Sequence, residues 1–165
     1  MKRTLAGLSL SLGLLLVAAT AAFGLPPFTT APKHAAGSGG QAQVSHLRIG
    51  CHTTFDRLVL RAAFGAPRYD VRYVKRIVED GSGKPVHLLG TKRIRILLRN
   101  ARGHTNGGTN LLPSVRTPLC PNLRQVKNAG DFEGVVTLGL GLRHKTGFRV
   151  FRLTGPKRLV VDILH

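Results

Sequence analysis

The chain has 165 residues, which is enough for one domain with a hydrophobic core and too few for two. Its 25 Lys and Arg residues face only 7 Asp and Glu residues, so the net charge is +18. Such a charge attracts polyanions in general, including nucleic acid, anionic lipid and teichoic-type polymers, and does not choose among them.

The first 22 residues have the order of a secretory signal peptide. Lys2 and Arg3 form a basic start, residues 5–17 are almost wholly apolar, and Ala19-Thr20-Ala21 offers small residues to a signal peptidase. The apolar run is short for a membrane span and has no basic stop-transfer flank, which favours cleavage over a retained anchor. No Cys directly follows the run, which excludes a lipoprotein anchor there. We therefore expect export, and a secreted, extracellular or cell-wall-associated protein.

Residues 23–43 have the composition of a linker. They contain Pro26-Pro27 and the run Ala35-Ala36-Gly37-Ser38-Gly39-Gly40. Because Pro, Gly, Ser and Ala build no core, we expect a disordered, flexible linker here and a single folded domain over 44–165.

Strand-like runs repeat through this domain. In the clearest, Ile94, Ile96 and Leu98 alternate with arginines. The predicted strands are 44–51, 55–62, 69–78, 86–89, 93–99, 132–138, 148–153 and 158–164. No helix of ordinary length is evident, and short strands at this spacing predict an all-β fold, an antiparallel β-sandwich.

Residues 100–121 break the pattern, because they are rich in Gly, Asn and Pro and have little periodicity. A loop of this length indicates a binding loop or a mobile insertion. Cys51 and Cys120, the two cysteines of an exported chain, most simply form one disulfide that anchors the end of this loop. Closing about seventy residues in this way would stabilise the fold by roughly 4 kcal/mol.

Alternating arginines are the strongest functional signal of the sequence. Residues two apart on a strand share a face at a spacing of about 7 Å. If their strands are neighbours, these arginines form one basic sheet face that binds a ligand; the alternative is a solvated face that keeps the protein soluble. Acidic residues, which a solvated face normally mixes in, are scarce here. The candidate ligand-binding residues are Arg57, Arg61, Arg72, Arg76, Arg93, Arg95 and Arg99.

Signals for catalysis are weak. Asp131 and Glu133 would share a strand face as paired carboxylates, but neutralisation of nearby Arg side chains is the simpler interpretation. His46, Cys51 and His52 lack the paired spacing of a zinc site. The serines show no G-x-S-x-G motif. We expect no catalytic residue, no metal site and no cofactor.

Several segments resemble, in order, the AMIN-like domain of secreted actinobacterial proteins. The similarity covers about residues 44–165, and its motif positions include Asp56, Arg57, Asp131, Phe132 and Glu133. The segments are His52-Thr53-Thr54-Phe55-Asp56-Arg57-Leu58-Val59-Leu60, Asp80-Gly81-Ser82-Gly83-Lys84-Pro85-Val86, Leu119-Cys120-Pro121-Asn122-Leu123-Arg124-Gln125-Val126, the run Gly130-Asp131-Phe132-Glu133-Gly134-Val135-Val136-Thr137, and the ending Arg158-Leu159-Val160-Val161-Asp162.

The resemblance implies a β-sandwich in the cell envelope. The related AMIN domain targets cell-wall amidases and some outer-membrane secretion proteins to peptidoglycan, whereas AMIN-like members mostly lack a known ligand. This chain departs from the family pattern at Lys92-Arg93-Ile94-Arg95, where neutral or acidic residues are expected, and at Gln125, which replaces Glu. Both changes favour an anionic ligand.

We therefore predict a secreted, non-enzymatic module that binds a cell-envelope polymer, either peptidoglycan or its anionic attachments, through a basic sheet face. An envelope protein is a further candidate partner. The alternatives are a general polyanion or nucleic-acid binder and, third, a cell-wall hydrolase. The chain has no Trp and two Tyr, which argues against stacking on nucleic-acid bases.

Overall fold

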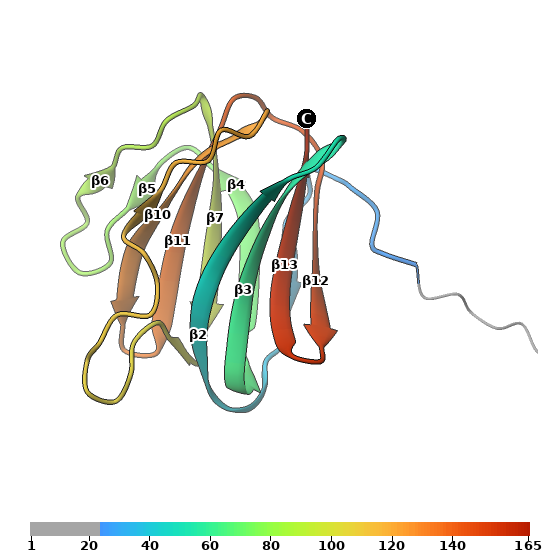
Figure 1. Ribbon diagram of the computed structural model, residues 1–165. Coiled ribbons are helices and arrows are strands. Elements are labelled where there is room, and N and C mark those ends of the chain that lie inside the picture. Colours follow the sequence, from blue (N-terminus) through green and yellow to red (C-terminus); the bar gives the residue numbers. More distant parts are fainter. Residues whose placement is uncertain (1–23) are drawn as a thin grey trace, which may run out of the picture.

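A computed structural model describes residues 24–165, and they form an all-β structure. Two main sheets pack face to face as a sandwich, which confirms the predicted fold class (Figure 1). The predicted signal peptide, residues 1–22, lies outside the described residues.

The first sheet has six strands, and all of its neighbouring strands are antiparallel. In spatial order the strands are β1 (Lys33–Ala35), β4 (Arg68–Val74), β7 (Lys92–Arg99), β11 (Val135–Leu142), β10 (Leu123–Phe132) and β9 (Val115–Arg116). The long central strands β4, β7 and β11 form the part of this sheet that positions most of the candidate arginines.

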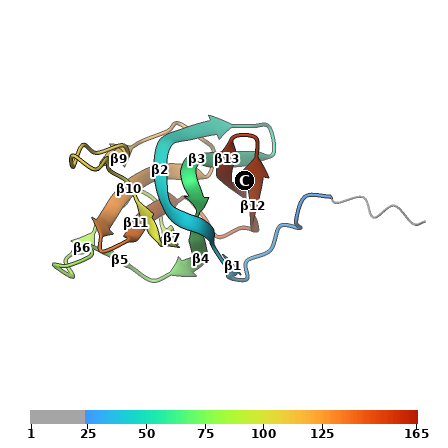
Figure 2. The ribbon, with the colours of Figure 1, turned by 90° about the horizontal axis from the view of Figure 1, so that it is seen from below.

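The second sheet has five strands. In spatial order they are β12 (Phe148–Thr154), β13 (Lys157–Leu164), β3 (Phe55–Ala66), β2 (Ser38–Cys51) and β8 (Ala101–Arg102). The short β8 pairs in parallel with β2, and the other pairs are antiparallel. A separate ribbon of β5 (Ile77–Val78) and β6 (Pro85–Val86) lies beside β10 and β11, as the view from below shows (Figure 2).

The core lies between the two sheets and follows the two-residue alternation of the strands. Ile94, Ile96 and Leu98 of β7 are completely buried, as are Leu58 and Leu60 of β3. Burial of each such side chain contributes about 1.5–3 kcal/mol. Because neighbouring residues on a strand point to opposite faces, this burial turns the alternating arginines to the outside of the sandwich.

The predicted linker over 23–43 is wrong for its second half. Lys33–Ala35 forms β1 and pairs with β4, and β2 begins at Ser38. β1 is an edge strand, and its pairing needs only backbone hydrogen bonds to β4, while Ala42 of β2 is completely buried. Gly37 is required here, because a Cβ at this position would lie 2.7 Å from the backbone N of Arg68. The composition of the segment therefore does not predict such a strand.

Other boundaries also differ from the prediction. The strand predicted over 132–138 begins only at Val135, as β11, and β10 was not predicted. The strand predicted over 69–78 ends at Val74 and resumes as β5, and the strand predicted over 86–89 is only the short β6. The predicted loop 100–121 contains β8 and β9 and buries Leu112, so part of it belongs to the fold.

Candidate functional site

The outer face of the six-stranded sheet is covered on one side and open on the other. The segment that contains β5 and β6 packs Ile77 and Leu88 onto β11. Gly139 and Gly141 permit this close approach, since a Cβ on Gly141 would lie 2.0 Å from the carbonyl oxygen of Leu89. Glycine within a strand is typical of such a close backbone approach. The cover stops short of β7 and β4, whose outward side chains stay accessible.

A hollow of about 330 Å³ lies on this open half, and we call it the first arginine hollow. Its lining consists of His34, Arg68, Tyr69, Asp70, Arg72, Arg95, Leu97 and Arg99. In the β4–β7 register Arg68 lies opposite Arg99, and Arg72 lies opposite Arg95. Asp70 lies between these two pairs on β4. Four guanidinium groups and one imidazole therefore surround a single carboxylate.

Asp70 neutralises only part of this charge. Its carboxylate accepts both hydrogen bonds of a bidentate contact from Arg72, and Arg95 Nη2 lies 3.6 Å from Asp70 Oδ1. Hydrogen bonding to Arg72, and the charge of Arg72 and Arg95, hold the pKa of Asp70 below its usual range. The same contact raises the pKa of Arg72. Asp70 therefore stays ionised well into acid.

The two arginines at the other end of the hollow have no acceptor among residues 24–165. Arg68 and Arg99 are exposed and form no ion pair within residues 24–165. Arg95 Nε is buried without a hydrogen-bond partner in the same part of the chain. A buried donor without a partner carries an uncompensated cost of desolvation. The hollow therefore presents guanidinium donors of the kind that bind anions.

Cationic side chains continue along the same two strands beyond the first arginine hollow. Arg93 lies opposite Val74 and lines a neighbouring hollow with Lys75, Lys92 and Lys145. The ammonium group of Lys145 lies 5.4 Å from the centre of the Tyr73 ring. The open face of β4 and β7 is therefore basic along its whole length.

Arg57 lies on the other sheet and is held in an ion-pair cluster. Its Nε and Nη2 donate to the two carboxylate oxygens of Asp162 at 2.6 and 2.8 Å, and Arg149 Nε donates to Oδ2 at 2.8 Å. Asp162 is completely buried, and the bond to it raises the pKa of Arg57. Both guanidinium groups also lie near the ring of Phe55, at 5.0 and 5.5 Å from its centre. Arg57 thus already has a partner inside the protein.

The structure divides the predicted binding arginines between two faces. Arg72, Arg93, Arg95 and Arg99 lie on the six-stranded sheet, whereas the strand with Arg57 and Arg61 belongs to the five-stranded sheet. Arg76 is exposed between β4 and β5 and lies outside any strand. The expectation of one continuous face is therefore wrong, because β3 is not a neighbour of β4 or β7.

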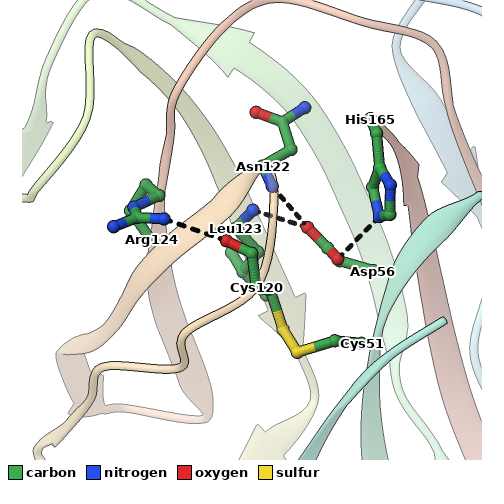
Figure 3. The surroundings of a disulfide bond; sticks show 7 residues. All are labelled: Cys51, Asp56, Cys120, Asn122, Leu123, Arg124 and His165. Carbon is green, nitrogen blue, oxygen red and sulfur yellow. Dashed lines mark hydrogen bonds and ion pairs between the residues drawn. A yellow bond between two sulfur atoms is a disulfide. The ribbon is translucent and has the colours of Figure 1, made fainter. Parts of the chain in front are cut away.

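The acidic motif positions have structural partners. Asp56 is completely buried and accepts hydrogen bonds from the backbone N–H groups of Asn122 and Leu123, at 2.9 and 2.7 Å, and lies 2.9 Å from His165 Nε2 (Figure 3). The Cys120 end of the long loop leads directly into this contact. Asp56 therefore fixes the start of β10 against β3.

Asp131 and Glu133 do not form a carboxylate pair on one strand face. Asp131 Oδ2 accepts the N–H of Gly103 at 2.9 Å and lies 2.8 Å from His104 Nδ1. Glu133 lies in the turn after β10 with a left-handed backbone, φ 48°, and its side chain is exposed. The partner of Asp131 is thus a loop amide and a histidine, where an arginine was expected. Phe132, between them, is 64% exposed.

Cys51 and Cys120 form a disulfide with Cα atoms 5.2 Å apart, which confirms the predicted pairing (Figure 3). Asp56 lies close enough to both sulfur atoms to suggest a cluster of metal ligands. Both thiols are consumed by the disulfide, however, and no thiolate is left to bind a metal. The bond anchors the end of the long loop to β2.

Sequence reasoning missed several residues of these clusters. His34 falls in the predicted linker, and Arg68 and Arg149 were not singled out. Arg68 begins the strand in which Arg72 was noticed, so the two-residue alternation of β4 was the signal that could have found it. Arg149 and Asp162 are opposite each other only through strand pairing, which no local pattern reveals.

Comparisons with known proteins agree with this arrangement. Residues 42–165 match the AMIN-like domain. Neither the curated proteins nor the solved structures contain a match to the chain. Residues 24–165 include no helix long and apolar enough to cross a membrane. The disulfide and the domain both fit an extracytoplasmic location, and the domain suggests a binding module of the cell envelope. Because the match spans most of its length, the chain belongs to the AMIN-like family.

Proposed function

We propose that this protein is a secreted, non-enzymatic module that binds an anionic polymer of the cell envelope, peptidoglycan or its anionic attachments, through the first arginine hollow. One observation carries the proposal: Arg68, Arg72, Arg95 and Arg99 face a single carboxylate on an uncovered sheet face. Guanidinium groups bind carboxylate and phosphate in a bidentate manner, and an anionic polymer supplies these groups in series.

The spacing of the arginine pairs suits a repeating ligand. The Arg68–Arg99 pair and the Arg72–Arg95 pair are four residues apart along the strands, which corresponds to about 13 Å. Asp70 and Leu97 occupy the register between them. Two anionic groups of one extended polymer can therefore each contact an arginine pair, while Asp70 disfavours negative charge between the pairs.

The chemistry of the hollow favours binding over catalysis. Its titratable groups are four arginines, one histidine, Tyr69, whose pKa is raised by burial, and one carboxylate already held by Arg72. Among them only His34 is left as a candidate general acid or base. His34 is exposed on an edge strand. This composition supports the proposed non-enzymatic role, as does a family whose domain is generally a non-catalytic module.

The second candidate is a general polyanion or nucleic-acid binder, which the net charge of +18 favours. Proteins that hold single-stranded nucleic acid combine a basic groove with exposed aromatic rings on which bases stack. The aromatic residue that lines the hollow, Tyr69, is only 8% exposed. The hollow therefore offers charge without a stacking platform, which favours a saccharide or phosphate polymer.

Binding of the full-length protein to insoluble purified wall, with and without its anionic polymers and across a salt series, tests the proposal. The variant Arg68→Gln/Arg99→Gln should bind more weakly, and its slope of log affinity against log salt should fall by about two, one for each lost contact. The matched control Lys84→Gln/Arg143→Gln removes the same charge from exposed positions outside the hollow.

Equal losses in the two variants would contradict a localised site and leave only non-specific attraction. Competition then separates the two candidates. If single-stranded DNA displaces the protein from the wall as effectively as the released anionic polymer does, the protein is a general polyanion binder. If DNA is a poor competitor at equal charge, the envelope polymer is the ligand.

A further inference from the structure

A second basic hollow lies on the outer face of the five-stranded sheet, on the opposite side of the sandwich from the first. Its volume is about 340 Å³. We call it the second arginine hollow, and its lining consists of His46, Arg48, Val59, Arg61, Pro156 and Arg158. Among these residues only Arg61 belongs to the set that the sequence indicated.

Three neighbouring strands build this hollow through their register. Arg48 of β2 lies opposite Val59 of β3, and Arg61 of β3 lies opposite Arg158 of β13. Val59 and Pro156 contribute apolar surface between the cationic groups. Arg158 Nε donates to the carbonyl oxygen of Pro156 at 3.2 Å, which holds this guanidinium group at the rim.

A β-bulge sets which side chains of β2 face outward beside this hollow. The register of β2 against β3 shifts between Ser45 and Arg48, and His46 has a left-handed backbone with φ 52°. Val44 and Leu47 are consequently both buried although they lie three residues apart, and His46 and Arg48, on either side of Leu47, are exposed. A left-handed residue other than glycine is strained, and bulges re-aim side chains next to functional sites.

The second arginine hollow contains no acid. Within residues 24–165 none of its arginines forms an ion pair, although the same strands pair Arg57 with Asp162 further along. Like charges that face each other across strands destabilise the pair, so the Arg61–Arg158 juxtaposition is unfavourable in the free protein. A bound anion would remove this repulsion.

We propose that the second arginine hollow is a separate anion-binding site, which takes a phosphate or carboxylate group attached to a ring or another partly apolar body. Since the two hollows lie on opposite faces, one domain would hold two polymer segments and bridge them. The bridging rests on the function proposed for the first arginine hollow, whereas anion binding by the second does not.

Titration of the full-length protein with inorganic phosphate tests the second site alone. The Nε–Hε signals of Arg48, Arg61 and Arg158 in nitrogen–proton NMR spectra should shift with saturation. In the variant Arg61→Gln/Arg158→Gln, the shift of the Arg48 signal should reach half-saturation at a phosphate concentration at least roughly tenfold higher, because two charged donors are lost. An unchanged Arg48 response would overturn the site. The signals of Arg68 and Arg99 report the first hollow independently.

A capture experiment tests bridging. Full-length protein is bound to immobilised polyphosphate, and the surface is then offered fluorescent polyphosphate from solution. The wild type and the control Lys84→Gln/Arg143→Gln should capture it. Arg61→Gln/Arg158→Gln should still bind the surface but capture only background, and at matched loading Arg68→Gln/Arg99→Gln should do the same.

The outcomes separate the two proposals. If only the variant of the first hollow loses capture, two copies of the chain bridge through their first hollows and the second site is refuted. If Arg61→Gln/Arg158→Gln loses capture of fluorescent polyphosphate while Arg68→Gln/Arg99→Gln binds purified wall like the wild type, the function proposed for the first arginine hollow is refuted. The second arginine hollow then remains an anion-binding site.

Discussion

The β3–β13 strand pair uses arginine in two different ways along its length. At one end Arg57 lies opposite Asp162, and four residues further along Arg61 lies opposite Arg158. Where Arg57 lies opposite Asp162, the acid is buried and holds two guanidinium groups against it. Where Arg61 lies opposite Arg158, Arg61 is exposed, Arg158 is half-buried, and neither forms an ion pair within residues 24–165.

This difference teaches that an arginine on the outer face of a strand is not by itself a binding residue. The residue opposite it decides its role. The end with Asp162 also contains the disulfide and buried Asp56, and these groups tie β3 to β2 and to the start of β10. We expect mutations at this end to change stability, and mutations at the arginine end to change binding.

Loss of the disulfide should give the largest effect on stability. The disulfide closes a loop between two cysteines that are 69 residues apart in the sequence. The variant Cys51→Ser/Cys120→Ser opens this loop, and its free energy of unfolding should fall by about 4 kcal/mol. Urea denaturation measures this change. Phosphate binding at the two arginine hollows should persist wherever the variant is still folded. Lost binding in the folded variant would break the proposed division between the two ends.

Substitution of Asp162 should have the next largest effect. Asp162 is completely buried, and Asp162→Asn removes the negative charge that pairs with Arg57 and Arg149. We therefore expect the free energy of unfolding to fall by about 3 kcal/mol. The control Arg61→Gln removes a repulsion between like charges and should change stability by less than about 1 kcal/mol. Equal destabilisation by both variants would show that the two registers are equivalent.

Acid titration gives a smaller effect and sharpens the comparison within the first arginine hollow. The pKa of Asp70 is lowered, so its stabilising contribution is complete above the ordinary Asp pKa of the unfolded chain and is lost as pH falls through the lower folded value. In the same acidic window protonation of Asp70 frees Arg72 and Arg95.

Binding of a methanesulfonate probe, the anion of a strong acid that keeps its charge in this range, should therefore strengthen as pH falls through the lowered pKa. Isothermal calorimetry between neutral and strongly acidic pH measures this change. In Asp70→Asn the strengthening below the ordinary Asp pKa should disappear, and binding in that acidic window should already be tight. A pH profile that is the same in wild type and Asp70→Asn would show that Asp70 does not limit access of anions to the hollow.

Local patterns were sufficient to predict much of the fold. The alternation of Ile94, Ile96 and Leu98 with arginines predicts both the strand and the direction in which its arginines point, because side chains alternate strictly along a strand. The even, minimal number of cysteines predicts the Cys51–Cys120 bond. Both inferences need only neighbouring residues or the composition of the chain.

Strand β1 and the bulge in β2 could not be found in this way. Lys33–Ala35 has no hydrophobic period, and it becomes a strand because the free edge of β4 offers hydrogen-bond partners. His46 and Arg48 look as if they alternate normally, yet the register shift beside them determines where Val44 and Leu47 are buried. Register is a property of two strands, and the sequence of one strand does not contain it.

The sequence by itself determined that the chain is a basic β-sandwich of the AMIN-like family with outward arginines, since charge, alternation and ordered motifs are all written in local residue order. Only the tertiary structure decided which arginines are available. Asp162 reaches Arg57 across one strand pair, and no acid reaches Arg61 or Arg158 within residues 24–165. A carboxylate neutralises the charge that lies beside it in space. Strand pairing brings Asp162 beside Arg57, although the two residues are 105 positions apart in the sequence.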